Sequence, residues 1–292
     1  MMPAPRSDLV PIDFDDLARH SVWPKRLLGL ETFGVRQKSE LEVLREFQQE
    51  RWHALLERVR DLKHPTLSEV ERIYNEPTAI GPCYVDGSFY LASQKQMLDV
   101  HLDLYAEVLA PYIEGASCLV ELGAGYGSKL LGLSSRKAFL SVPLAAGEFT
   151  QNGRDLISLL ATHLNKSVSV GHCDFRTLTT TDLRIPEGAV IFTSYAAHYV
   201  PEMPVDFVRF LACFKPRAVV HFEPCYEYFD QQSLHGLMCR RYMELNDYTR
   251  NLASVIEAGQ RQEGISVRVR KNVLGSNPFL PLSVIEWSPA GQ

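Results

Sequence analysis

Apolar positions in the first 113 residues follow a helical repeat. Residues 36–63 contain no Gly or Pro, and their apolar side chains recur every three or four positions, at Leu41, Leu44, Phe47, Leu55, Val59 and Leu62. This spacing predicts one apolar stripe along a long helix, with Ser39 as a candidate N-cap and Pro65 as its end. Further helices are expected at 67–74 and 92–113. Between them, residues 83–91 predict a hairpin that turns at Asp86-Gly87.

The pattern changes at Ser117, where short apolar runs begin to alternate with helical segments. Strands are expected at 118–122, 139–145, 168–171, 189–194 and 218–222, and helices at 128–133, 155–164, 205–214 and 231–262. Two strands, 266–273 and 282–287, follow. The alternation predicts a largely parallel sheet that is covered on both faces. The short connection between the last two strands predicts an antiparallel pair at one edge.

Composition narrows the class of protein. The chain has 292 residues, of which 46% are hydrophobic and 22% are charged, and its net charge is −5. This composition is typical of a globular protein with one large domain, and the acidic balance disfavours a nucleic-acid partner. No apolar run is long enough for a membrane helix, and the first residues do not resemble a signal peptide, so we expect a cytoplasmic protein without membrane association.

The cysteines give no sign of a metal centre. Six are present, and no two have the CxxC spacing. Most of them fall inside apolar segments, so we expect reduced, buried thiols and predict no metal site. A zinc site would have to pair cysteines that lie far apart in the sequence.

The segment from Val120 to Ser128, VELGAGYGS, contains the most informative motif. It joins an expected strand to an expected helix, and its glycines at 123, 125 and 127 allow a tight turn and close approach to a ligand. The helix that follows begins with free N–H groups facing that ligand. A dinucleotide fingerprint requires a small residue at the sixth position, where glycine is usual, but the third glycine here comes one position earlier. A glycine-rich turn without a ligand and a nicotinamide site remain alternatives.

An acid at 121 followed by this glycine spacing resembles motif I of class I S-adenosylmethionine-dependent methyltransferases. The order of elements over about 115–290 is also similar to that family. The resemblance implies a Rossmann-like, doubly wound α/β sheet of seven strands with the last strand antiparallel. It implies S-adenosyl-L-methionine as the cofactor, bound by Glu121, Gly123, Gly125 and Gly127. Residues 114–292 would form the methyltransferase domain and residues 1–113 a helical lid. A dimer interface or a stabilising cover is the alternative role for these N-terminal helices.

The resemblance also implies further cofactor-binding residues. The family places an acid after the second strand to bind the ribose hydroxyls, and Glu148 is the only acid between 122 and 154. Phe149 follows it. A second acid, Asp174, would bind the adenine amino group, and Phe175 would pack on the ring. As alternatives, Glu148 is a surface acid or part of the next helix, and Asp174 caps a loop.

The acceptor side is expected after the fourth strand, where the family faces the transferred methyl group. Tyr195 and His198 are candidate catalytic residues, with His198 as a general base because imidazole titrates near neutral pH. Tyr199 is a candidate acceptor contact. Glu223, after the fifth strand, would bind the acceptor or cap the following helix. The alternative for the aromatic residues and for His198 is packing.

Two other groups are candidates for ligand contacts. Tyr84, Tyr90 and Lys95 precede the first strand of the cofactor fold, so they are expected near the methionine end of the cofactor or near the acceptor. Arg240 and Arg241 belong to a basic concentration late in the chain. They would attract a carboxylate-bearing acceptor or a peptide, or they form a solvated face.

Together these patterns favour a methyltransferase of specialised biosynthesis that acts on a small molecule or a modified peptide, and they are compatible with a homodimer. No Asn-Pro-Pro-aromatic motif follows residue 194, which disfavours methylation of an amide or an adenine. Two alternatives remain: a transferase of the same fold that uses a carboxylated S-adenosylmethionine, and a non-catalytic partner or scaffold protein.

Overall fold

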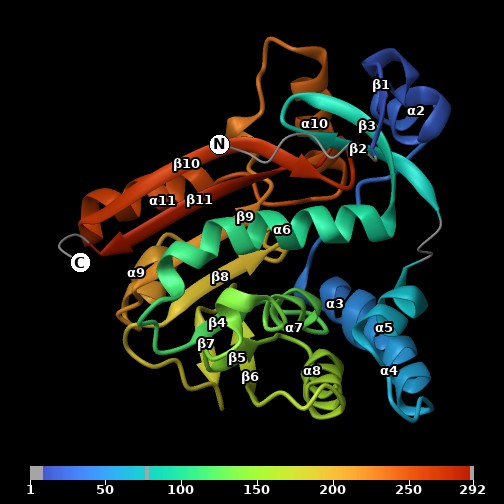
Figure 1. The fold of residues 1–292 in the computed structure, drawn as a ribbon. Helices are drawn as coiled ribbons and strands as arrows, with labels where there is room; N and C mark the ends of the chain where they lie inside the picture. The colour runs from blue at the N-terminus through green and yellow to red at the C-terminus, as the bar shows by residue number, and fades with distance from the viewer. Residues whose placement is uncertain (1–8, 76–78, 290–292) are drawn as a thin grey trace.

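The computed structural model describes residues 9–75 and 79–289, and a single mixed sheet lies at its centre (Figure 1). Its strands are β1 Val10–Ile12, β2 Ile80–Val85, β3 Ser88–Ser93, β4 Leu119–Leu122, β5 Leu144–Gly147, β6 Val168–Asp174, β7 Thr179–Thr181, β8 Val190–Ser194, β9 Ala218–Glu223, β10 Ile265–Gly275 and β11 Leu282–Pro289. The spatial order is β1-β3-β2-β10-β11-β9-β8-β4-β5-β6-β7.

The middle of the sheet agrees with the sequence analysis. Strands β6, β5, β4, β8 and β9 are parallel, and the last strand, β11, lies antiparallel between β9 and β10. The prediction of seven strands is wrong, because the described residues form eleven. Strands β1 and β7 have only three residues each, too few for a periodic pattern. The β10–β11 pair is also not at an edge, because Leu274 and Gly275 of β10 pair with β2.

The helices cover both faces of the sheet. They are α1 Leu17–His20, α2 Trp23–Leu27, α3 Glu40–Val43, α4 Trp52–Arg60, α5 Leu67–Tyr74, α6 Gln94–Ile113, α7 Ser128–Leu133, α8 Gln151–His163, α9 Phe207–Ala212, α10 Leu234–Leu245 and α11 Leu252–Glu263. Residues of α6, α7 and α8 share one apolar core with the sheet, and residues of α9 and α11 share a second core on the other face. Burial on both faces explains why the central strands read as continuous apolar runs. In the described part of the chain, no helix has the length and apolar character needed to cross a membrane.

The long N-terminal helix contains an unpredicted π-helical segment. Helical structure runs without a break from α3 through the π-helical residues Leu44–Arg51 into α4, and the Ser39 hydroxyl accepts a hydrogen bond from the Glu42 backbone N–H, as its predicted N-cap role requires. A π turn holds more residues than an α turn, so it rotates the side chains that follow it. The predicted apolar stripe is therefore broken: Leu41 is 77% exposed, whereas Leu55 and Val59 are buried.

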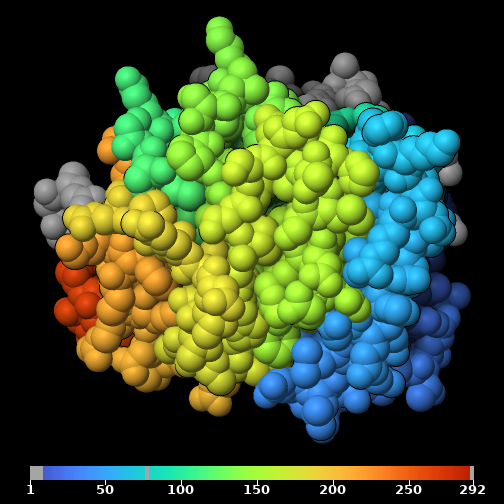
Figure 2. Space-filling view, turned by 90° about the horizontal axis from the view of Figure 1, so that it is seen from below, coloured from blue at the N-terminus to red at the C-terminus, as the bar shows by residue number. Residues whose placement is uncertain are grey.

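Helices α4 and α5 form an outer layer against α7 and α8. Their apolar side chains share one buried cluster, which contains Trp52, Leu55, Leu56, Val59, Val70, Tyr126, Leu131, Leu156 and Leu160. Figure 2 shows the blue and cyan N-terminal helical atoms packed directly against the yellow-green surface that contains α8. Other parts of the first 113 residues join the sheet itself, as strands β1, β2 and β3.

Other differences from the predicted elements are local. The hairpin turns at Asp86 and Gly87, both with positive φ, as predicted. Strand β5 begins only at Leu144, because residues 137–139 form a 3₁₀ turn. The expected helix over 231–262 is two helices, separated at Asn246–Asn251, where Asp247 has a φ of 50°. Five of the six cysteines are buried, and none forms a disulfide.

Candidate functional site

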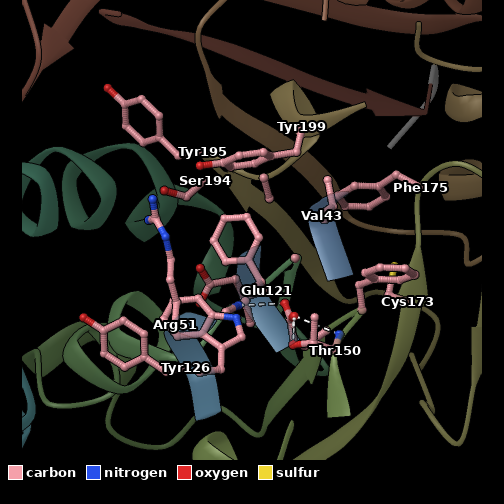
Figure 3. Close-up of a pocket in the computed structure, with 18 of the residues that line it drawn as sticks. Val43, Arg51, Glu121, Tyr126, Thr150, Cys173, Phe175, Ser194, Tyr195 and Tyr199 are labelled. Carbon is pink, nitrogen blue, oxygen red and sulfur yellow. Dashed lines mark hydrogen bonds between the residues drawn. The ribbon is translucent and has the colours of Figure 1, made fainter. Parts of the chain in front are cut away.

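A cavity of about 250 Å³ lies at the carboxyl ends of β4, β5, β6 and β8, beneath the helical segment from α3 to α5. Ligands of open α/β sheets bind at this end of the strands. Four segments supply its walls: the glycine loop after β4, the residues just after β5 and β6, the segment after β8, and the inner face of the N-terminal helices (Figure 3). We call the first three the sheet wall and the last the lid wall.

The glycine loop follows β4 and forms the floor of the cavity. Gly123 has a φ of +73°, and a Cβ atom there would lie 2.3 Å from the Cβ of Ala196. Gly125 has a φ of +59°, and its Cβ would lie 3.1 Å from the indole ring of Trp52. Residues that carry a side chain rarely adopt a positive φ, and at Gly123 the contact with Ala196 leaves no room for a Cβ atom. The loop therefore needs glycine both for its turn and for its neighbours.

Gly127, the third glycine of the motif, is not among the residues that line the cavity, and its predicted contact with the cofactor remains a prediction. It directly precedes α7, has a φ of +80°, and donates its backbone N–H to the carbonyl of Ala124 at 2.8 Å. A Cβ atom there would lie 3.1 Å from the Ile157 side chain of α8. Gly127 thus faces the helices behind the loop. Its role is to turn the chain into α7 and to let α8 pack closely.

Glu121 and Glu148 hold the two sides of this loop. Glu121 is buried and its carboxylate accepts the backbone N–H of Leu130 at 3.0 Å; burial raises its pKa to about 8, against the opposing charge of Lys129. The two carboxylate oxygens of Glu148 accept hydrogen bonds from the N–H of Gly125, at 2.9 Å, and from the N–H and hydroxyl of Thr150, at 2.9 and 2.7 Å. Burial raises the pKa of Glu148 despite these bonds.

The turn before β5 explains the position of Glu148. Because the chain turns at residues 137–139 before β5 starts, Glu148 follows the strand directly, although it lies far from Glu121 in sequence. It lines the cavity and is 5% exposed, so the surface-acid alternative does not hold. A carboxylate has about four acceptor positions, and three are used, which leaves one for a ligand hydroxyl.

Asp174, Phe175 and Phe149 also line the cavity. Asp174 accepts the backbone N–H of Arg176 at 2.8 Å and the hydroxyl of Thr177 at 2.9 Å, so it shapes its own loop as the alternative interpretation expects. The two roles are compatible, because a carboxylate that orders a loop still presents lone pairs to the cavity. Phe175 is 7% exposed and contacts the ring of Phe207 edge-on.

The segment after β8 is strained at Tyr195, whose φ is 49°. Such a conformation is uncommon for residues other than glycine and is typical of functional sites. Tyr195 lines the cavity, but its hydroxyl points away from it and donates to the carbonyl of Leu280 at 3.1 Å (Figure 3). Its neighbour Ser194, which the sequence analysis did not select, is linked to the buried Tyr105 hydroxyl at 2.8 Å.

Glu223 shapes the same segment from below and does not contact the cavity. It is completely buried, and its carboxylate accepts the backbone N–H groups of Ala196 at 2.9 Å, Ala197 at 3.0 Å and His198 at 3.4 Å. The pKa of Glu223 lies below its ordinary value. Burial alone would raise this pKa, but the hydrogen bonds and the nearby His198 ring lower it by more. These bonds give Glu223 a positioning role, and its predicted contact with the acceptor remains a prediction. It does not cap the following helix, because Ser233 caps α10.

His198 and Tyr199 occupy an aromatic cluster beside the cavity. His198 is 2% exposed, does not line the cavity, and has its Nδ1 atom 3.3 Å from the Glu223 carboxylate. Its ring lies 4.3 Å from the ring of Tyr199 and 4.5 Å from that of Tyr248. This placement favours packing over a general base for His198. Tyr199 does line the cavity, where it faces the lid wall.

The remaining sequence candidates lie elsewhere. Tyr90 pairs with β1 and β2, Tyr84 stacks on His235, and Lys95 forms an exposed ion pair with Asp99 at 2.9 Å. These residues precede β4 in the chain, but β10, β11, β9 and β8 separate their hairpin from β4 in the sheet. Neighbours in sequence are thus not neighbours in space here.

The basic candidates late in the chain are also outside the cavity. The guanidinium of Arg240 lies 3.8 Å from the ring centre of Tyr226, and Arg241 lies 3.4 Å from the Glu244 carboxylate. Neither lines the cavity. Local partners on α10 and on the preceding turn engage both charges, so the structure does not bring them to an acceptor site.

The lid wall supplies functional residues that the sequence analysis missed. Phe47, Arg51, Trp52 and Tyr74 line the cavity from this side, and Lys129 and Arg176 add cations from the sheet wall. The lid is fastened at two places. The Gln48 side-chain oxygen accepts the backbone N–H of Asn152 at 2.9 Å, and the Tyr126 hydroxyl donates to Glu71 at 2.6 Å. The sequence analysis placed Phe47 in a packed apolar stripe and did not select Trp52.

No protein-family model and no curated protein matches the chain. Among solved structures, the chain is similar to magnesium protoporphyrin IX methyltransferase from Synechocystis PCC 6803, crystallised with bound SAH. The two are 12% identical, the match covers 86% of this chain and 100% of that one, and the TM-score is 0.51.

Two further similarities are weaker. The methyltransferase domain of bacterial CtHen1 is 17% identical over 66% of this chain and 99% of its own, with a TM-score of 0.45. The O-methyltransferase NcsB1 from neocarzinostatin biosynthesis, solved with S-adenosyl-L-homocysteine and 1,4-dihydroxy-2-naphthoic acid, is 19% identical over 68% of this chain and 57% of its own, with a TM-score of 0.44. At such identities only the fold is comparable, and the full-length match carries that comparison: the chain has the class I methyltransferase fold.

Proposed function

We propose that the protein is an S-adenosylmethionine-dependent methyltransferase. The observation that carries this proposal is the convergence of three separate sequence features on one cavity. The glycine loop, the acid after β5 and the Asp174-Phe175 pair after β6 are far apart in the chain, yet all of them line the same cavity. A glycine-rich turn without a ligand would not need this convergence.

The residues of the sheet wall fit this cofactor. Glu148 has an acceptor position left for the ribose, Asp174 and Phe175 would receive the adenine, and Lys129 would face the carboxylate of the methionine part. When bound, the cofactor supplies a methyl group on a positively charged sulfur, which a nucleophile displaces.

The protein's own contribution would be orientation and exclusion of water. Such a transfer needs the two reactants held in line more than it needs acid–base chemistry. The segment after β8, fixed by Glu223 from below, would form the wall beside the reacting atoms, and the lid wall would close over them. The cavity of about 250 Å³ is below the roughly 300–1,000 Å³ usual for ligand sites. We therefore expect the lid to open when a cofactor and an acceptor enter.

For the acceptor we propose a small molecule or a modified peptide of specialised metabolism. The aromatic residues of the lid wall support this class, because they cover one side of the cavity and offer an apolar contact surface to a small ligand. The atom that receives the methyl group would be an O, N or S nucleophile placed beside Ser194.

Calorimetry tests the proposal directly. We expect saturable binding of S-adenosylmethionine and of its demethylated product, S-adenosylhomocysteine, and no binding of NADH. If the folded protein binds neither sulfur compound, the methyltransferase proposal is wrong and a scaffold role takes its place.

A further inference from the structure

We propose that the lid wall is the acceptor site and that it accepts an aromatic carboxylate, with Arg51 as the receptor of the carboxylate group. This inference rests on the proposed function. It names a substrate class and a recognition residue that the resemblance to the methyltransferase family does not supply.

The first argument is the charge of the lid wall. One Arg51 nitrogen lies 2.8 Å from the carboxylate of Glu46, and another donates to the hydroxyl of Tyr74 at 3.2 Å. The same Glu46 carboxylate lies 2.6 Å from the ammonium group of Lys38, which is only 6% exposed. Two cations thus share one carboxylate, and the group of three keeps a net positive charge. An anionic ligand would balance it.

Arg51 is also placed to use that charge. Its side chain is 44% exposed and lines the cavity, where Figure 3 shows it rising between Tyr126 and Ser194. Glu46 and Tyr74 fix the guanidinium but occupy only part of its five N–H donors. A planar guanidinium with free donors matches a carboxylate in two parallel hydrogen bonds.

The second argument is the shape of the surroundings. The Arg51 guanidinium lies 5.2 Å from the ring centre of Phe47, and Trp52 and Tyr199 pack against that same ring. The rings of Phe47 and Tyr199 meet at 4.9 Å and 85°, and those of Phe47 and Trp52 lie 5.6 Å apart. Aromatic walls with one fixed polar group favour a flat apolar ligand that carries a single polar end.

The π-helical segment explains how one helix presents both features. The extra residue in its turns lets Phe47 and Arg51 line the same cavity as Trp52, the first residue of α4. Such turns cost hydrogen-bond geometry and are found mostly where function retains them. None of the residues in this segment is fully buried, so packing alone does not account for it.

The carboxylate of the cofactor is the competing occupant. The sheet wall already offers it Lys129, beside the glycine loop and close enough to Glu121 to oppose the rise in its pKa. Arg51 instead stands on the lid, which would close over the acceptor. We therefore assign Lys129 to the cofactor and Arg51 to the acceptor.

The test uses full-length protein saturated with S-adenosylhomocysteine. One-ring and two-ring hydroxylated aromatic carboxylates are titrated by calorimetry, each beside its uncharged carboxamide. Wild-type protein should bind the carboxylates at least about tenfold more tightly than the carboxamides, as expected for a charge-assisted pair. Arg51→Gln should remove this preference, and Arg51→Lys should retain part of it.

Arg45→Gln is the matched control. Arg45 lies on the same helical segment, pairs with Glu42 and does not line the cavity. Its loss should leave the preference unchanged, and thermal unfolding of each variant should show that the fold is intact. No preference in the wild type, no binding of any probe, or a preference that survives in Arg51→Gln would overturn the proposal.

A second set of titrations, with cofactor analogues, shows whether Arg51 binds the carboxylate of the cofactor or that of the acceptor. If Arg51→Gln weakens binding of S-adenosylhomocysteine but not of methylthioadenosine, which lacks the amino-acid part, Arg51 serves the cofactor and the acceptor proposal is wrong. That outcome would leave the methyltransferase proposal standing. Failure of the wild type to bind S-adenosylhomocysteine would instead remove the proposed function itself.

Discussion

The two walls of the cavity are built in different ways. On the sheet wall, carboxylates bind the main chain: Glu148 holds the N–H groups of Gly125 and Thr150, and Glu223 holds three consecutive N–H groups after β8. The lid wall is held by single contacts between separate segments, as in Tyr126 with Glu71 and Gln48 with Asn152. The sheet wall is therefore fixed by the backbone of the fold, whereas the lid wall depends on contacts that can break one at a time. A fixed wall suits a cofactor, and an adaptable wall suits an acceptor.

Replacing a glycine on the sheet wall should give the largest effect. In Gly123→Ala the new Cβ would lie 2.3 Å from Ala196, which is itself fixed by Glu223. We expect affinity for S-adenosylhomocysteine to fall by at least about 100-fold, or about 3 kcal/mol, because the loop must move.

Gly125→Ala provides the comparison, because its Cβ would meet only the Trp52 ring of the lid wall, at a longer distance of 3.1 Å. We expect its affinity to fall by about tenfold, mainly from the positive φ. Calorimetry on both variants, with circular dichroism to confirm folding, measures the difference. Equal affinities for the two variants would contradict the distinction between the walls.

A pH titration of stability should reveal the cost of Glu121 in the sheet wall. Burial raises its folded pKa to about 8 from an ordinary 4.5, so the unfolded chain loses this proton first as pH rises. Stability should fall between pH 4.5 and pH 8, by at most about 5 kcal/mol, and the contribution is constant outside that window.

Glu121→Gln keeps a side-chain acceptor for Leu130 but has no proton to lose in this range. Its free energy of unfolding in urea should decline less than that of the wild type between about pH 5 and pH 8. His101 and His221, whose pKa values burial lowers to about 4, contribute equally to both proteins and cancel in the difference. Parallel pH profiles would show that Glu121 is not the group responsible.

Loosening the lid wall should give the smallest effect. Tyr126→Phe removes the hydrogen bond to Glu71 and should cost about 1 kcal/mol, which corresponds to roughly fivefold faster hydrogen exchange of the α5 amides. Cofactor affinity should change little.

Tyr112→Phe is its control, because Tyr112 also donates to a glutamate, Glu286 at 2.9 Å, but lies on α6, outside the cavity lining. In Tyr112→Phe, the hydrogen exchange of the α5 amides should be unchanged. If Tyr126→Phe leaves α5 exchange unchanged as well, the bond to Glu71 does not fasten the lid.

The contrast between the two walls also explains how much of the site could be predicted from the sequence. The glycine loop, Glu148 and Asp174 could be found in the sequence because each follows a recognisable strand. The motif alone could not separate Gly123 and Gly125, which face the cavity, from Gly127, because the packing of α8 decides which side of the loop is open.

Two other parts of the site depend on contacts between distant segments. Tyr90 was expected near the loop because it precedes the loop in the chain, but strand order decides position in a sheet. Lys95 lies in the first turn of α6, where it is exposed and pairs with Asp99. The lid wall could not be predicted, because one π-helical segment rotates the helix. Arg51 acquires its partners Glu46 and Tyr74 only through that rotation.

The position of β11 has a consequence for how the protein assembles during synthesis. This strand is the last of the described strands, yet it lies inside the sheet, between β9 and β10. Until it is in place, the parallel strands and the N-terminal hairpin have no continuous sheet between them, because β11 alone connects β9 to β10. The parallel half can form earlier, but both flanks of this gap expose open strand edges, which are prone to wrong pairing. Closure of the described sheet therefore depends on this one eight-residue strand.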